Sequence, residues 1–260
     1  MHAFFSANWQ RILEHNQLAN FDAFWSLTTP WFEEPNMRRG GWSGVTKVIV
    51  KIDNNQQQTL FVKRQENHSS RTWLHPIKGL ATFEKEFHNL QRFHHYDIPT
   101  LTPVYFASRE VAGNRQAILV TEELKGYLPL DAPELLNDSR TVSLSKQRRL
   151  LLRAVACVAR KMHQHHLQHN CFYPKHIFVK KQQDSWSVKI IDLEKTKRTL
   201  TQRAAVIRDL ATLLRHSPDT PLKEQIYFLK AYLGEQKLTN SSRQLIKAIQ
   251  STIAAKKGRH

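Results

Sequence analysis

Histidines form the densest group of potential ligands in this sequence, in the stretch MHQHHLQH from Met162 to His169. Imidazole nitrogens ligate zinc and similar metals, but a site requires three or four ligands that converge on one ion. On a helix only the pairs 163/166 and 166/169 would share a face, and the stretch contains no carboxylate or cysteine. We therefore interpret it as the basic end of a helix.

A different chemistry is suggested by three separate positions. Asp192 follows the apolar run VKII, and an apolar run that ends in a lone carboxylate is not the pattern of a solvated face. Lys63 ends the run TLFVK, and Glu86 lies in FEKEFHNL. Phosphoryl transfer from ATP needs a lysine on the triphosphate, a carboxylate that holds the lysine, and oxygen ligands for Mg²⁺. The sequence supplies each of these residue types.

The composition is that of a basic globular protein. The 260 residues include 39 Lys and Arg against 22 Asp and Glu, a formal charge of +17. With 40% apolar residues, 8 Gly and 10 Pro, the chain is neither collagen-like nor wholly disordered. The charge indicates a polyanionic partner, which can be nucleic acid, the anionic inner leaflet of a membrane, or a phosphorylated substrate.

Cysteine content and hydropathy indicate the compartment. The two cysteines, Cys157 and Cys171, cannot form a disulfide framework or a four-cysteine zinc site, and we expect a reducing, cytoplasmic location. No window approaches ~18 consecutive apolar residues, and the start lacks the features of a secretory signal. We therefore expect no membrane-spanning segment.

Periodicity and turn signals predict the elements that position these residues. Residues 1–37 carry scattered aromatic residues and are expected to form a helical extension. The β-branched runs VTKVIVKI and TLFVKR predict a hairpin around DNNQQQ, and PVYFASREV and QAILVTEEL predict another. Helices are predicted at 80–93, at 144–168 beginning near Ser143 or Ser145, at 204–216 and at 221–255, with two short strands after residue 168.

This order predicts an α+β, two-lobe fold, with a small β-rich N-lobe at 38–124 and a helical C-lobe at 125–260. The chain resembles the lipopolysaccharide kinase family, which is the group of InaA and, more distantly, of the Kdo and heptose kinases. The resemblance covers roughly residues 38–216 and is strongest in HNCFYPKHIFV and VKIIDLEK. It implies a protein-kinase-like fold and ATP-dependent phosphorylation of a sugar of the lipopolysaccharide inner core.

The resemblance also implies roles for the residues above. Lys63 resembles the strand lysine that reaches the phosphates of ATP, and Glu86 resembles the helix glutamate that pairs with it, with Glu84 as the alternative. Asp192 resembles the aspartate that binds Mg²⁺. His176 stands where kinases carry a metal-binding asparagine, and it either ligates the metal or forms a hydrogen bond to phosphate or to Asp192.

The catalytic loop departs from the kinase pattern. Kinases place an aspartate five residues before the metal ligand as the base that accepts the proton of the substrate hydroxyl. The corresponding position here is Cys171, in the loop sequence His169-Asn170-Cys171. A thiol cannot orient a sugar hydroxyl as a carboxylate does, although its thiolate can accept a proton. A pseudokinase that binds nucleotide without turnover is therefore the alternative function.

The remaining candidates are weaker in sequence. Gly41 and Gly44 precede the first strand-like run, where backbone amides can cradle phosphates, but their spacing is not that of a Gly-x-Gly-x-x-Gly signature. The segment VTEEL, which includes Glu122, resembles the hinge that meets adenine. Asp209 resembles the helix aspartate that supports the catalytic loop through hydrogen bonds.

Basic clusters determine the expected partners. They lie at 148–149, 180–181, 195–198 and 256–259, and they suit the phosphorylated lipopolysaccharide core, or its lipid-linked precursor, at the anionic inner membrane surface. A third function, nucleic-acid binding, has the least support, because no nucleic-acid module is visible and aromatic residues are not interleaved with the clusters.

Overall fold

The computed structural model describes residues 2–38, 40–53, 55–72, 75–136 and 145–257. It divides into two compact units, one of Met1–Arg92 with Leu101–Lys125 and the other of Phe93–Thr100 with Gly126–His260. The first unit is rich in strands and the second in helices, so the expected α+β organisation is confirmed. Ser143 and Arg259, which entered the expectations above, lie outside the described residues.

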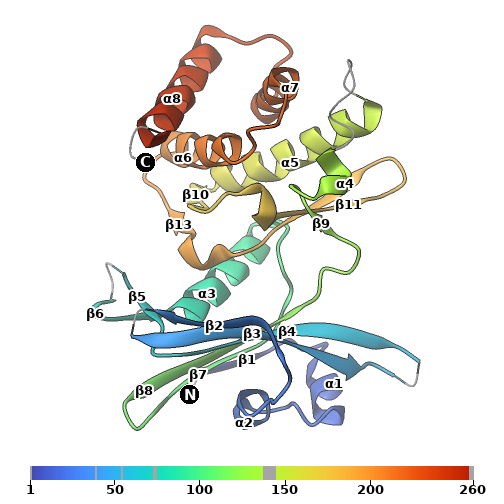
Figure 1. Cartoon of the computed structure of the whole chain (residues 1–260), viewed down its shortest axis with the longest axis vertical. Helices are drawn as coiled ribbons and strands as arrows, with labels where there is room; N and C mark the ends of the chain where they lie inside the picture. Colours follow the sequence, from blue (N-terminus) through green and yellow to red (C-terminus); the bar gives the residue numbers. More distant parts are fainter. Residues whose placement is uncertain (1, 39, 54, 73–74, 137–144, 258–260) are drawn as a thin grey trace. The chain divides into compact units, whose positions relative to one another are not determined.

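A six-stranded antiparallel sheet is the framework of the first unit (Figure 1). Its order is β1-β7-β8-β4-β3-β2. The strands are β1 (His2–Phe5), β2 (Trp31–Arg38), β3 (Gly41–Lys51), β4 (Gln57–Glu66), β7 (Pro103–Val111) and β8 (Asn114–Glu122). Both predicted hairpins, β3–β4 and β7–β8, are confirmed.

The N-terminal segment differs from the helical extension that was expected. It contains two short helices, α1 (Gln10–His15) and α2 (Phe21–Trp25), but β1 pairs with β7 and β2 pairs with β3. Consecutive residues of β1 point to opposite faces of the sheet, and accordingly Phe4 contacts Phe87 while Phe5 contacts Tyr105. The scattered aromatic residues are thus explained by strands as well as helices.

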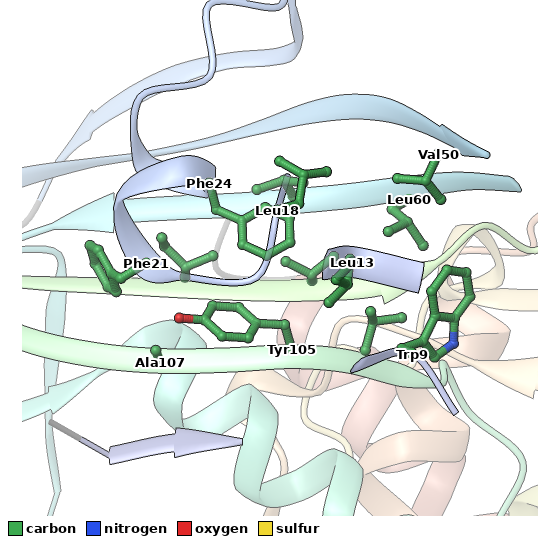
Figure 2. Close-up of a cluster of buried hydrophobic side chains, with 13 residues drawn as sticks. Trp9, Leu13, Leu18, Phe21, Phe24, Val50, Leu60, Tyr105 and Ala107 are labelled. Carbon is green, nitrogen blue, oxygen red and sulfur yellow. The ribbon is translucent and has the colours of Figure 1, made fainter. Parts of the chain in front are cut away.

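The segment that contains α1 and α2 covers one face of the sheet and completes its core (Figure 2). Phe24 is fully buried and stacks on Tyr105, with 5.0 Å between the ring centroids. Burial of aromatic and aliphatic surface of this kind is the main stabilising contribution of a core. The cluster comprises Trp9, Leu13, Leu18, Phe21, Phe24, Val50, Leu60, Val62, Val104, Tyr105, Ala107, Ile118 and Val120.

Helix α3 (Thr82–His95) packs on the opposite face of the same sheet. Phe87 stacks on Phe106 at 4.4 Å, and Phe106 pairs across the strands with Leu119, which pairs with Lys63. Directly opposed residues of an antiparallel pair share a face, so α3 and Lys63 lie on the same side of the sheet. Two further strands, β5 (Ser69–Thr72) and β6 (His75–Ala81), form a separate antiparallel pair that was not predicted.

The second unit is built from helices and short strands. The helices are α4 (Pro133–Leu136), α5 (Lys146–Gln164), α6 (Gln202–Arg215), α7 (Leu222–Leu233) and α8 (Asn240–Lys257). The strands are β9 (Leu128–Pro129), before α4, and β10 (Leu167–Gln168), β11 (Ile177–Lys181), β12 (Trp186–Ile190) and β13 (Lys197–Arg198), between α5 and α6. One three-stranded sheet has the order β12-β11-β9, and β10 pairs with β13. Two 3₁₀ turns, η2 (Pro174–His176) and η3 (Leu193–Lys195), follow β10 and β12.

Two helix predictions in this unit are corrected. Ser145 caps α5, because its side chain accepts a hydrogen bond from Arg148 N–H, but the helix ends at Gln164 and not at residue 168. The segment 221–255 is two helices, because Gly234 ends α7 with a left-handed backbone at φ 73°. Glycine adopts that conformation without the penalty of a Cβ atom, which explains why the helix stops there.

Candidate active site

Lys63 and Glu86 meet in the first unit. Lys63 Nζ lies 2.7 and 2.8 Å from the two oxygens of Glu86, which α3 places beside β4. The Glu86 side chain is 1% exposed and that of Lys63 is 17% exposed. A buried carboxylate therefore holds the ammonium group at the surface of the sheet. Glu84, the alternative partner, is not the residue in this contact.

The register of the strands shows which side chains accompany Lys63. Lys63 pairs with Val45 on β3 and with Leu119 on β8, and Phe61 pairs with Lys47 and Thr121. All of these residues share one face of the sheet, because residues two apart on a strand point the same way. The face thus carries two lysines among apolar and aromatic residues.

The two candidate glycines are explained by packing within the sheet. A Cβ atom on Gly41 would lie 2.0 Å from Glu66 O, so the close approach of β3 to the end of β4 requires glycine. A Cβ atom on Gly44 would lie 2.6 Å from the Trp31 ring. Gly44 pairs with Arg64, whose neighbour in sequence is Lys63, so this Cβ direction is away from the Lys63 face. Binding of phosphate by these backbone amides stays a prediction.

Glu122, at the end of β8, has a structural partner that the sequence did not suggest. Its Oε1 accepts a hydrogen bond of 2.8 Å from Trp9 Nε1, which ties α1 to the segment expected to be the hinge. The Glu122 N–H donates to Thr102 O. A role in nucleotide binding would therefore fall to backbone groups of the neighbouring residues 123–124.

In the second unit Asp209, on α6, holds the loop that follows β10. Its carboxylate accepts hydrogen bonds from His169 N at 2.6 Å and from Asn170 N at 3.0 Å. The same carboxylate lies 3.2 Å from His163 Nε2, and His163 Nδ1 lies 2.9 Å from the Tyr232 hydroxyl. Asp209 and His163 are fully buried, so each polar atom needs such a partner. His163 lies in the last, basic turn of α5 as predicted, and its burial against Asp209 is what the sequence did not indicate.

His169 connects this loop to the segment before Asp192. Cys171 N–H donates to His169 Nδ1 at 3.2 Å, so Nδ1 carries no proton. His169 Nε2 lies 2.9 Å from Ile191 O, which only accepts, so Nε2 carries the proton. Burial lowers the pKa of His169, which agrees with the neutral ring that these two contacts require. With both nitrogens engaged, His169 is suited to position the loop.

His176 and Asp192 lie side by side across the same two segments. His176 Nδ1 is 2.9 Å from Cys171 O and 3.3 Å from Asp192 Oδ2. Both oxygens are acceptors, so Nδ1 carries a proton, and in the neutral ring Nε2 then keeps a free lone pair. Asp192 has a left-handed backbone with φ 61° and ψ 57°. Such strain in a residue other than glycine is typical of functional positions.

Cys171 occupies the position of the missing base. The residue is 6% exposed, and burial raises the pKa of its thiol, although the charge of Lys195 acts in the opposite direction. A protonated thiol is a poor proton acceptor. Lys195, in η3, entered the sequence analysis only as part of a basic cluster, because its approach to Cys171 joins two separate segments, which the hydrogen bond between Asn170 Nδ2 and Lys195 O also connects.

The structure therefore groups the candidates into two sets. Lys63 and Glu86 are together in the first unit, whose sheet also contains Gly41, Gly44 and Glu122, and the other five lie around one pair of loops in the second unit. These five are His169, Cys171, His176, Asp192 and Asp209. Among the described residues no group of three or more His, Cys, Asp or Glu side chains forms a metal site.

The donor set is compatible with Mg²⁺ in one respect and unusual in another. Mg²⁺ commonly binds one or two carboxylates and completes its six ligands with water and substrate phosphates, which fits the single, partly exposed carboxylate of Asp192. Imidazole is a softer ligand than Mg²⁺ prefers. Asp192 is the better candidate ligand, and His176 is well placed to orient it.

Comparison with known proteins decides the family. The model of the Lipopolysaccharide kinase (Kdo/WaaP) family matches residues 22–232. The chain belongs to this family. The protein InaA of Escherichia coli (strain K12) is 29% identical over 212 residues, which cover 82% of this chain and 94% of that protein.

A solved structure supports the same fold. WaaP in complex with acyl carrier protein has a TM-score of 0.70 to this chain, with 20% sequence identity, and the match covers 98% of this chain and 99% of WaaP. The expected kinase-like two-lobe fold is thereby confirmed. As a member of the Kdo/WaaP family, the chain is a lipopolysaccharide kinase by classification. No helix among the described residues is long and apolar enough to cross a membrane.

Proposed function

We propose that this protein transfers a phosphoryl group from ATP to a sugar of the lipopolysaccharide inner core, or of its lipid-linked precursor, at the anionic inner membrane surface. The observation that carries the proposal is the ion pair between Lys63 and Glu86. A carboxylate that is 1% exposed has a large desolvation cost, and an ammonium group held at a sheet face offsets it. The pair keeps a positive charge available for the triphosphate.

Residues of each unit have further roles in the proposed reaction. Backbone groups of residues 123–124 would contact adenine, and Asp192, oriented by His176, would hold Mg²⁺. When bound, Mg²⁺ neutralises charge on the phosphates. His169 and Asp209 keep the loop that contains Cys171 in a fixed conformation through the hydrogen bonds described above.

A double-mutant cycle tests the role of the ion pair. We expect Lys63→Met and Glu86→Gln each to weaken ATP binding about tenfold or more, as loss of a charge-assisted contact does. The double variant should lose less ATP-binding free energy than the two single variants lose together, because each single variant already breaks the pair. Isothermal titration with ATP and Mg²⁺ measures the affinities, and Glu84→Gln on the same helix is the matched control. Strictly additive losses, or an equal loss in the control, would contradict the proposal.

A pseudokinase without turnover is the second candidate, and the buried thiol of Cys171 favours it. If the absent carboxylate limits the reaction, Cys171→Asp should raise phosphate transfer to extracted lipopolysaccharide by about 10²-fold, the usual contribution of a general base. ATP affinity should stay unchanged, because the base acts on the acceptor hydroxyl. The neighbouring Lys195 would partner the new carboxylate.

The matched control for this experiment is Cys157→Asp, because Cys157 is the other free cysteine and is exposed. Cys171→Ala separates loss of the thiol from gain of a carboxylate. If a folded Cys171→Asp variant binds ATP and transfers nothing, the pseudokinase function is favoured. If Cys171→Ala abolishes an activity of the parent protein, the thiol itself takes part in the reaction.

A further inference from the structure

Helices α6 and α8 pack together in the second unit, and both carry cationic side chains. Arg208 and Arg215 are seven residues apart on α6, and therefore lie on the same side of that helix. Helix α8 packs against α6 and contributes Lys256. Burial, and then the charges of Arg215 and Arg208, lower the pKa of Lys256, while the charge of Asp209 acts in the opposite direction, which agrees with the packing of α8 against α6.

His216, which follows α6, contacts Arg215 of that helix and Tyr173. Arg215 Nη2 is 3.1 Å from His216 Nε2, and because a guanidinium group only donates, Nε2 is the acceptor. The His216 ring meets the edge of the Tyr173 ring at 4.5 Å. Burial, and then the charges of Arg215, Lys175 and Lys256, lower the pKa of His216. We call Lys175, Arg208, Arg215, His216 and Lys256 the His216 cluster.

The His216 cluster has no carboxylate partner among the described residues. None of its members takes part in an ion pair with a described acid. Asp209, a buried acid whose charge acts on Lys256, already accepts hydrogen bonds from His169 N and Asn170 N, and Glu224, a buried acid that lines the same cavity as His216, is paired with Arg148. Asp219 lines the same cavity as His216, but it is exposed and forms no ion pair with the cluster.

The position of the helix end explains only part of this arrangement. Cations near the last turn of a helix interact favourably with its dipole, which accounts for Arg215 and His216. Arg208 lies two turns earlier, Lys175 belongs to η2, and Lys256 belongs to α8. Bringing these positive charges together is unfavourable unless an anion neutralises them.

The His216 cluster is also adjacent to the loop that carries Cys171. Tyr173 contacts the rings of both His216 and His176, with 5.4 Å to the latter. Lys175 immediately precedes His176 in the same 3₁₀ turn. A group bound at the cluster would therefore lie beside the residues proposed to face the acceptor hydroxyl.

We propose that the His216 cluster binds a phosphate group already present on the sugar acceptor and thereby orients the acceptor beside the loop 169–176. This inference rests on the proposed function, since it names a subsite for the substrate of that reaction. Guanidinium groups bind phosphate oxygens in pairs, and Arg215, in contact with His216, would be joined by the neighbouring cations of the cluster in binding a phosphate. A nucleic acid or a membrane surface would instead need an extended basic face.

A binding experiment tests the subsite without requiring turnover. The probe is glucose 1-phosphate, with glucose as the uncharged control, and the ring signals of His216 are followed by NMR. We expect the phosphate ester to bind and to raise the pKa of His216, because a bound anion favours the imidazolium form. The double variant Arg208→Gln/Arg215→Gln should bind it at least about tenfold more weakly.

The matched control is Arg203→Gln/Arg243→Gln, which removes the same charge from exposed positions of α6 and α8 outside the His216 cluster. Equal binding by the parent and both double variants would overturn the proposal, as would binding to phosphatidylglycerol vesicles without binding to the phosphate ester. If the double variant does not fold, the single variant Arg208→Gln, whose side chain is exposed, gives the same test.

A transfer assay separates this proposal from the proposed function. Extracted lipopolysaccharide is compared before and after removal of its phosphates, and ATP affinity is measured in parallel. We expect the Arg208→Gln/Arg215→Gln variant to have a raised KM for the phosphorylated acceptor and an unchanged ATP affinity. Normal ATP binding and an unchanged KM in the variant would contradict the subsite alone. Absence of ATP binding in the parent would contradict the proposed function, while the NMR result would still decide whether the cluster binds phosphate.

Discussion

At the scale of single residues, the loops around His169 and Asp192 are held by hydrogen bonds from Asp209, His169 and His176. Asn170 and Asp192 both have positive φ values, 66° and 61°. His169, which precedes Asn170, donates its backbone N–H to Asp209, and its ring binds the carbonyl of Ile191, which precedes Asp192. Asp209 and Asp192 could be named from sequence because the family pattern places them. The tautomer of His169 and the approach of Lys195 to Cys171 could not, because they depend on contacts between residues more than twenty positions apart.

The fixed tautomer of His169 leads to a prediction about pH. Its pKa lies below 6.5 in the folded protein, and the unfolded chain has the ordinary value of 6.5. As the pH falls below 6.5, the unfolded chain therefore takes up a proton that the folded protein does not, so folding becomes less favourable by up to about 1.4 kcal/mol per pH unit. Above 6.5 both states are neutral and the effect is absent.

Urea unfolding between pH 7.5 and pH 5 measures this dependence. We expect His169→Gln, which cannot titrate, to show a smaller loss of stability over that range than the parent, whatever its stability at pH 7.5. His166→Gln, at an exposed position three residues earlier, is the control and should behave as the parent does. Identical pH dependence in all three proteins would contradict the role assigned to the buried ring.

At the scale of elements, regular periodicity could be predicted and pairing between distant segments could not. The hairpins β3–β4 and β7–β8 and the helices α3 and α5 have local signals of alternation, helical spacing or capping. β1 and β2 are recognisable only by their partners, β7 and β3. The break at Gly234 carried a local signal, a glycine after an apolar helical pattern, that the prediction of one helix at 221–255 overlooked.

A substitution in the N-terminal segment tests whether α2 is part of the core of the sheet. If α2 completes the core of the sheet, Phe24→Ala should destabilise the protein by about 3–5 kcal/mol, as removal of a buried aromatic side chain does. Phe32 is the matched control, because it is a phenylalanine of the same segment that is 53% exposed, and Phe32→Ala should cost under about 1 kcal/mol. Urea unfolding followed by tryptophan fluorescence measures both. Similar small losses would mean that the segment is a dispensable arm.

At the scale of the whole molecule, the positive charge is not spread evenly among ion pairs. The protein carries +17, and in the described part of the second unit the His216 cluster gathers cations without acids. In the first unit Lys63 is instead paired with a buried glutamate. Net charge could be counted from sequence, but this difference between a paired lysine and an unpaired cluster could not, because it depends on which segments the fold brings together.

Binding of ATP and Mg²⁺ should change the stability of the whole protein. A ligand that binds only the native state stabilises it by about 2.7 kcal/mol at one hundred times its Kd, which should raise the melting temperature by about 5–10 °C for a protein of this size. If Asp192 holds Mg²⁺, the parent should gain more from ATP with Mg²⁺ than from ATP with EDTA. Asp192→Asn should respond equally to both, since an amide is a weaker ligand than a carboxylate.

Asp184→Asn, in the exposed turn between β11 and β12, removes the same charge and should keep the full response to Mg²⁺. Equal responses of the parent to ATP with and without Mg²⁺, or an undiminished response in Asp192→Asn, would contradict the metal role of Asp192 while leaving the pairing of Lys63 and Glu86 to be judged by its own cycle.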